Sequence, residues 1–111
     1  MKLLILILNK VEKLEEVLEA FIEIGISGAT IIDSVGMGHI LCEEVPIFAG
    51  LRFMFSGAKP HNKTIFSVIK DEKEESALRI LKKILGDINE PGTGIVFTIP
   101  IHRVEGLKPE I

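Results

Sequence analysis

The sequence predicts an α+β fold in which two βαβ units share one four-stranded antiparallel sheet, with both helices on one face. An order of apolar strand, helix, glycine and strand occupies residues 2–35 and returns over residues 64–101 at nearly the same spacing. In each copy a polar residue precedes the helix and a glycine follows it. Two such units in 111 residues are typical of the ferredoxin-like arrangement, and we expect a single domain over residues 1–111.

The first strand, residues 2–8, is a nearly continuous apolar run, which indicates burial on both faces and a central place in the sheet. The helix that follows is expected over residues 11–24, because apolar residues recur there at steps of three and four. That stripe comprises Val11, Leu14, Val17, Leu18, Phe21 and Ile22. Asn9 and Glu12 are expected to form a capping box at its start, and Gly25 to take the left-handed conformation after its end.

The second repeat predicts the same elements. Its helix is expected over residues 72–85, with Asp71 and Glu74 as the cap and Gly86 as the stop. The remaining strands are expected over residues 29–35, 64–69 and 95–99. Because both helices lie on one face of such a sheet, the other face is left bare, and here it is rich in Leu and Ile. An apolar face of that size usually marks an interface, so the residues themselves predict self-association.

Composition narrows the function classes. The formal charge of −3 argues against nonspecific nucleic-acid binding, which needs clustered Lys and Arg. The single cysteine, Cys42, cannot form an intrachain disulfide, so a cytoplasmic location is expected. The apolar run at residues 3–8 is too short to span a bilayer. No Ser-His-Asp arrangement and no acid pair at defined helical spacing in a plausible cleft is recognisable, so we do not expect an enzyme.

The order of elements, together with several local matches, resembles the PII nitrogen-regulatory signalling proteins and their PII-like relatives. Residues 1–30 look like the first strand, helix and second strand of that family. The sequence at 36–39, GMGH, is similar to the start of its long T-loop, and the sequence at 48–53, FAGLRF, looks like the far side of that loop. Residues 91–100 read PGTGIVFTIP and resemble the B-loop and last strand. The resemblance covers roughly residues 1–104.

This resemblance implies a non-enzymatic signalling protein that forms a homotrimer and binds an adenine nucleotide (ATP, ADP or AMP) in clefts between subunits. A T-loop-like segment over about residues 36–52 would act on a target protein, such as an ammonium channel or a metabolic enzyme. The residues that match the nucleotide-binding positions of the family are Gly36, Met37, Gly38, Lys63, Gly92, Thr93, Gly94 and Arg103. Backbone amides at glycine bends form anion-binding concavities, although both glycine pairs also fit ordinary turns.

Several positions depart from the family pattern. Ile40 stands where a glutamine helps to hold magnesium and 2-oxoglutarate, and Ile95 stands where the B-loop supplies a phosphate-binding lysine. Phe48 replaces the tyrosine that is modified, and Pro46 occupies the other modification point. Arg103 is alone where the family usually has two arginines. The chain therefore fits a divergent PII-like protein better than an ordinary PII protein.

A metal-binding trimer of the related CutA-like type is the alternative function. A short cluster of His39, Cys42, Glu43 and Glu44 could bind zinc or copper. A structural zinc site normally needs four ligands, however, and His-x-x-Cys lacks two firm further ones. Glycines at both loop bases favour the nucleotide, whereas His39 and Cys42 favour the metal.

Residues 37–50 show neither a helical nor an alternating pattern, and we expect them to be mobile and to order on a ligand or partner. Their apolar side chains would each contribute roughly 1.5–3 kcal/mol when buried, before ordering costs. The alternative is that they fold back onto their own trimer. Because Phe48 lacks a hydroxyl, switching is expected to follow ligand occupancy and not modification at that position.

Overall fold

The computed structural model describes residues 1–44 and 61–107. The strands of this part are β1 (Lys2–Leu8), β2 (Thr30–Ser34), β3 (Asn62–Ile69) and β4 (Gly94–Pro100). Its α-helices are α1 (Leu14–Glu23), α2 (Met37–Glu44) and α3 (Glu74–Leu85), and the 3-10 turns η1 (Val11–Lys13) and η3 (Asp71–Lys73) lead into α1 and α3. The sheet order is β2-β3-β1-β4, and every neighbouring pair is antiparallel. The predicted α+β, ferredoxin-like fold is confirmed.

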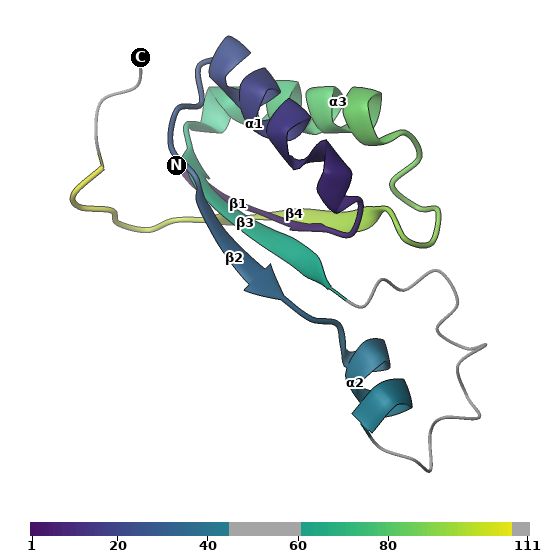
Figure 1. The fold of residues 1–111 in the computed structure, drawn as a ribbon. Coiled ribbons are helices and arrows are strands. Elements are labelled where there is room, and N and C mark those ends of the chain that lie inside the picture. Colours follow the sequence, from purple (N-terminus) through teal and green to yellow (C-terminus); the bar gives the residue numbers. More distant parts are fainter. Residues whose placement is uncertain (45–60, 108–111) are drawn as a thin grey trace.

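The core lies between the sheet and the two helices of the repeats, which cover one face of it (Figure 1). Leu4, Leu6 and Leu8 of β1 are fully buried on this face. They pack with helix residues such as Phe21 and Leu81. β1 has a partner on each side, as its continuous apolar run predicted. The α1 stripe is narrower than expected, because Val11 and Ile22 are exposed.

The opposite face of the sheet has no helix over it among the described residues (Figure 1). We call it the open face. It is formed by Leu3, Ile5, Ile7, Ile32, Phe66, Val68, Ile95, Phe97 and Ile99, which the strand register puts on one side. Ile5, for example, lies opposite Phe66 in one ladder and Phe97 in the other. Ile95 is 58% exposed and Phe97 42%. The expected burial of β1 on both faces is therefore wrong for the single chain, since nothing described here covers the second face.

The helix starts differ from the predicted caps. Neither helix has a side-chain hydrogen bond at its N-terminus, because each begins with a 3-10 turn instead of a capping box. Asn9 turns toward the sheet, where its Oδ1 accepts from Nδ2 of Asn62 at 3.2 Å. The predicted helix ends are correct: Gly25 has φ +88° and Gly86 φ +80°, conformations that glycine adopts without strain.

Each repeat supplies a lysine to the helix end of the other repeat. Lys10 Nζ, before α1, donates to the carbonyl oxygen of Leu85 at the end of α3, at 3.0 Å. Lys73 Nζ, before α3, donates to the carbonyl oxygen of Ile24 just after α1, at 2.7 Å. The last carbonyls of a helix lack intrahelical partners and carry partial negative charge, so these contacts stabilise both helix ends. The two repeats are thus joined by reciprocal polar contacts as well as by the sheet.

Within the described residues, no helix has the length and apolar character needed to cross a membrane.

Candidate functional site

Most of the residues expected to bind nucleotide lie at one end of the sheet. β1 and β2 finish there, while β3 and β4 begin there, because Leu8 lies opposite both Lys63 and Gly94 in the two ladders. We call this the loop end. It gathers seven of the eight expected residues, namely Gly36, Met37, Gly38, Lys63, Gly92, Thr93 and Gly94. β2 and β4 form opposite edges of the sheet, however, so the two glycine pairs are separated by about three strand spacings, or about 14 Å.

The segment before β4 forms a pocket of about 450 Å³. Its lining residues are Asn9, Ile88, Asn89, Glu90, Pro91, Gly92, Gly94, Ile95 and Val96. The turn is attached to the end of β1, because the backbone N–H groups of Asn9 and Lys10 both donate to the carbonyl oxygen of Thr93, at 3.2 and 3.4 Å. Gly92 has φ +82°. A concave, glycine-containing turn of this kind can hold an anion through its backbone.

Gly94 and Thr93 have structural reasons for their identity. A Cβ atom on Gly94 would lie 2.6 Å from the carbonyl oxygen of Ile7, and its φ is +151°. The side chain of Thr93 is buried, and its Oγ1 has no hydrogen-bond partner among the described residues. In the single chain the hydroxyl of Thr93 is therefore not presented to the pocket.

Gly36, at the end of β2, has no comparable structural reason. A Cβ atom there would meet nothing within 4 Å, and its φ is outside the left-handed region. Its carbonyl oxygen accepts from the backbone N–H of Ile40 at 3.3 Å, in the first turn of α2. Met37 and Gly38 lie in that same turn, and Met37 is 70% exposed.

The expectation that residues 37–50 lack regular structure is wrong for residues 37–44, which form α2. The apolar spacing from Met37 to Ile40 and Leu41 is compatible with a helix. No core receives these side chains, since α2 extends beyond the loop end (Figure 1) and both Met37 and Ile40 are exposed. The described side chains of the helix, at residues 37–41, therefore do not form the buried stripe by which a helix is recognised in sequence. The remainder of that stretch, residues 45–50, lies outside the described residues.

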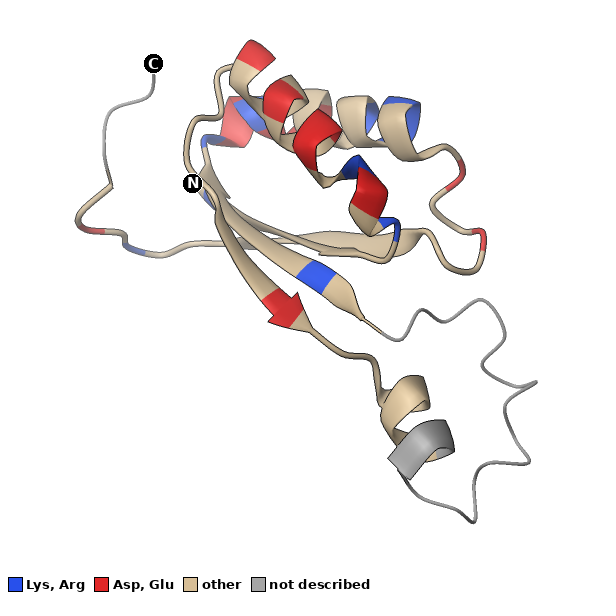
Figure 2. Ribbon diagram, in the orientation of Figure 1, with Lys and Arg blue, Asp and Glu red and all other residues tan. Residues whose placement is uncertain are grey.

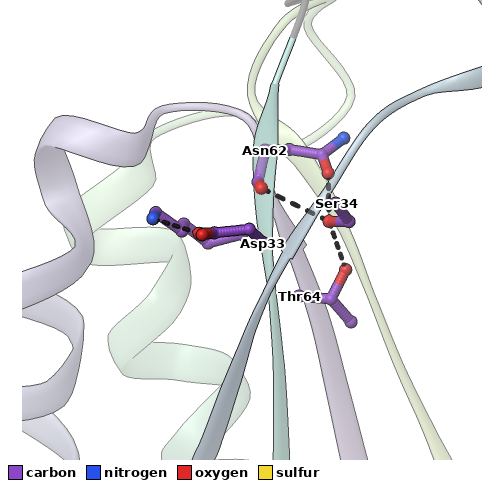
Figure 3. Close-up of polar contacts among 5 residues, drawn as sticks. Asp33, Ser34, Asn62 and Thr64 are labelled. Atoms are coloured by element: carbon purple, nitrogen blue, oxygen red, sulfur yellow. Dashed lines mark hydrogen bonds and ion pairs between the residues drawn. The ribbon is translucent and has the colours of Figure 1, made fainter.

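A polar network at the loop end was missed in the sequence. Ser34 Oγ makes a hydrogen bond with Thr64 Oγ1 at 2.7 Å, and also donates to the carbonyl oxygen and Oδ1 of Asn62 (Figure 3). Asn62, which is 7% exposed, connects this group to Asn9. The register puts these hydroxyls on the open-face side of β2 and β3. The sequence feature that could have revealed this network is the even spacing of polar residues, which puts Thr30 and Ser34 on one side of β2 and Asn62 and Thr64 on one side of β3.

Lys63, expected to contact nucleotide, is paired with Asp33 on the opposite side of β2 from Ser34 (Figure 3). Figure 2 shows the acidic residue on β2 beside the basic residue on β3. The hydrogen bond and positive charge of Lys63 lower the pKa of Asp33 below its ordinary value of 3.8. The ammonium of Lys63 is thus held at the β2 edge of the loop end, two strands away from Gly94.

Acid is expected to remove the stabilisation that the Asp33–Lys63 pair provides. A carboxyl group whose pKa is lowered by folding adds stability that is complete above its unfolded-state pKa and is lost as pH falls through the folded-state value. Asp33→Asn should therefore lower the urea midpoint at about pH 7 and have a smaller effect at about pH 2. Glu15→Gln, an exposed carboxylate on α1, is the control. Equal effects of Asp33→Asn at both pH values would contradict the prediction.

A family model described as nitrogen regulatory protein P-II matches residues 1–110. The chain belongs to the P-II family. No curated protein matches it. P-II proteins are regulatory, so the family supports a regulatory protein and confirms the resemblance drawn from the loop motifs. The CutA-like alternative is not favoured by this match.

Arg103 is the one expected residue of this P-II chain that lies away from the loop end. It follows β4, near the start of β1, where the backbone N–H of Ile101 donates to the carbonyl oxygen of Met1 at 3.1 Å. Gly94 and Pro100, the two ends of β4, are about 20 Å apart in an extended strand. Arg103 itself pairs with Glu105. Within one P-II subunit, Arg103 and the glycine turns therefore cannot contact the same small ligand.

The metal cluster suggested by the sequence lies on α2 of this P-II chain. His39 contacts a residue outside that cluster, His61, with ring centroids 5.7 Å apart. The side chains of Cys42, Glu43 and Glu44 are outside the described part. Among the described side chains, no group of three His, Cys, Asp or Glu residues could hold a metal ion.

Proposed function

We propose that this P-II chain is a non-enzymatic regulatory protein that binds an adenine nucleotide between the subunits of a homotrimer. The observation that carries the proposal is that the glycine pocket before β4 borders the open face. Ile95 lines the pocket and also belongs to the open face, where it is 58% exposed. A second subunit that covered the open face would therefore also form one side of the pocket. Burial of Leu, Ile and Phe side chains would drive that association.

The division of the expected contacts within one chain supports a site shared between subunits. Gly92 and Gly94 border the pocket, whereas Arg103 follows the far end of the same strand. Arg103 of a neighbouring subunit could reach this pocket, whereas Arg103 of the same subunit is too far from it. Because Ile95 replaces the expected lysine, phosphate would be held mainly by backbone N–H groups at the turn and by charges from outside it.

We further propose that the occupied site acts on a cytoplasmic partner protein through α2 and the T-loop-like segment that continues beyond it. α2 extends beyond the loop end and follows directly on Gly36 (Figure 1). Met37 and Ile40 offer exposed apolar side chains, which a partner could bury. The resemblance described in the sequence implies a metabolic enzyme or a membrane transporter as the kind of target.

Calorimetry with ATP, ADP and AMP tests this function. We expect one binding site per subunit for at least one of the three nucleotides. Gly36→Ala should weaken that nucleotide at least about tenfold, or about 1.4 kcal/mol, because a methyl group would block close approach of the ligand. The same variant should unfold at the wild-type temperature, because the added Cβ meets nothing within 4 Å.

The charge contribution is tested separately. Lys63→Ala should also weaken the nucleotide, while Lys82→Ala, an exposed cation on α3, should not. No heat with any of the three nucleotides, or equal affinities in the wild type and Gly36→Ala, would count against an adenine-nucleotide site.

A further inference from the structure

Two histidines from separate elements meet at the loop end. His39 lies in the first half of α2, and His61 is the residue directly before β3. Their ring centroids are 5.7 Å apart and the ring planes are inclined by 52°. Nothing in the nucleotide site described above uses either imidazole. The pair therefore represents a separate group of potential ligands, formed only when α2 and β3 are brought together by the fold.

The spacing of the two rings fits a shared metal ion. A zinc–nitrogen bond is about 2.0–2.1 Å long and a ring nitrogen lies about 1.1 Å from the imidazole centroid, so each centroid would lie about 3.2 Å from the ion. Two such rings have centroids about 5.2 Å apart at a tetrahedral angle and about 6.4 Å apart in a linear arrangement. The observed 5.7 Å lies between these limits.

The surroundings favour a cation that prefers nitrogen. Imidazole suits zinc, copper and nickel, whereas calcium and magnesium prefer oxygen ligands. The carboxylate of Asp33, which is paired with Lys63, is also close enough for its charge to interact with His61.

We propose that His39 and His61 bind one late first-row divalent cation, of the zinc, copper or nickel class, that joins α2 to the start of β3. The remaining coordination positions are filled by water. Because α2 otherwise extends beyond the sheet, a bound ion would fix the helix that carries Met37 and Ile40. The site does not depend on nucleotide binding.

Titration of the chelator-treated full chain with Zn²⁺ and Ni²⁺, without nucleotide, tests the proposal. We expect one ion per chain. His39→Gln and His61→Gln should each weaken binding by about 100-fold. His102→Gln removes an exposed histidine after β4 and should bind as the wild type does. Circular dichroism of each variant confirms that it is folded.

A spectroscopic readout identifies the ligands directly. In proton–nitrogen spectra of the imidazole groups, Zn²⁺ should shift the resonances of His39 and His61 together and leave those of His102 in place. Wild-type binding in both histidine variants would overturn the proposal. So would loss of binding in Cys42→Ser alone, because the thiol and not the imidazole pair would then be the ligand.

Discussion

Phe97→Glu is expected to convert the protein from a trimer into monomers. Phe97 lies opposite Ile5 on the open face and is 42% exposed in the single chain. In a trimer closed through this face, a carboxylate at this position would be buried without a partner, at a cost of several kcal/mol per subunit. The folded subunit should tolerate the change, because residue 97 does not face the core.

Light scattering at low micromolar concentration measures this effect. The wild type should give about three times the chain mass of 12.3 kDa, and Phe97→Glu should give the chain mass itself. Ile22→Glu is the matched control, since Ile22 is 53% exposed on α1 and away from the open face. A wild-type monomer, or a trimer that survives Phe97→Glu, would show that the open face is not the subunit interface.

Gly94→Ala is expected to destabilise the fold by about 2–4 kcal/mol. The added Cβ would approach the carbonyl oxygen of Ile7 to 2.6 Å, and a backbone atom within the sheet cannot move aside as a flexible side chain can. The φ of +151° adds strain for any residue other than glycine. Urea unfolding should show a lower midpoint with the slope unchanged.

Gly36→Ala is the control for this second experiment, because no atom lies within 4 Å of its added Cβ. A loss of stability below about 1 kcal/mol in Gly94→Ala would mean that β4 can shift away from β1 at this point. The comparison also separates two kinds of glycine. Gly94 is required by packing, so a change in nucleotide affinity in Gly94→Ala would not identify a ligand contact. Gly36 has no packing role, so a change in affinity in Gly36→Ala would identify one.

The fold was predictable because its signals are local and repeated. The apolar run of β1 predicted its central position, and Gly25 and Gly86 marked both helix ends. The caps were predicted incorrectly for a tertiary reason. Asn9 has the right chemistry for a cap, but Asn62, 53 residues away, takes its side-chain oxygen instead. A sequence pattern within one helix cannot reveal that competition.

The site was less predictable because it depends on contacts between distant segments. Both glycine motifs lie at the loop end, but the sequence could not distinguish Gly94, whose identity is constrained by the carbonyl oxygen of Ile7, from Gly36, which has no such constraint. α2 was missed because its apolar residues have no core to face. His61 is far from His39 in the sequence, and only the positions of α2 and β3 bring the two rings together.

The central position of β1 also determines what a newly made chain exposes during translation. β1 is synthesised before both of its flanking strands, which begin only at Asn62 and Gly94. At about 5–20 residues per second, a ribosome needs on the order of 4–17 s to extend the chain from Leu8 to Gly94. The apolar run at residues 3–8 lacks both native partners until β3 has been made and lacks one of them until β4 has been made, and short uncharged β-forming segments pair readily with copies of themselves. Nascent chains on neighbouring ribosomes are therefore vulnerable to co-aggregation through the apolar run at residues 3–8, and a chaperone that covers this run until β3 and β4 emerge would protect them.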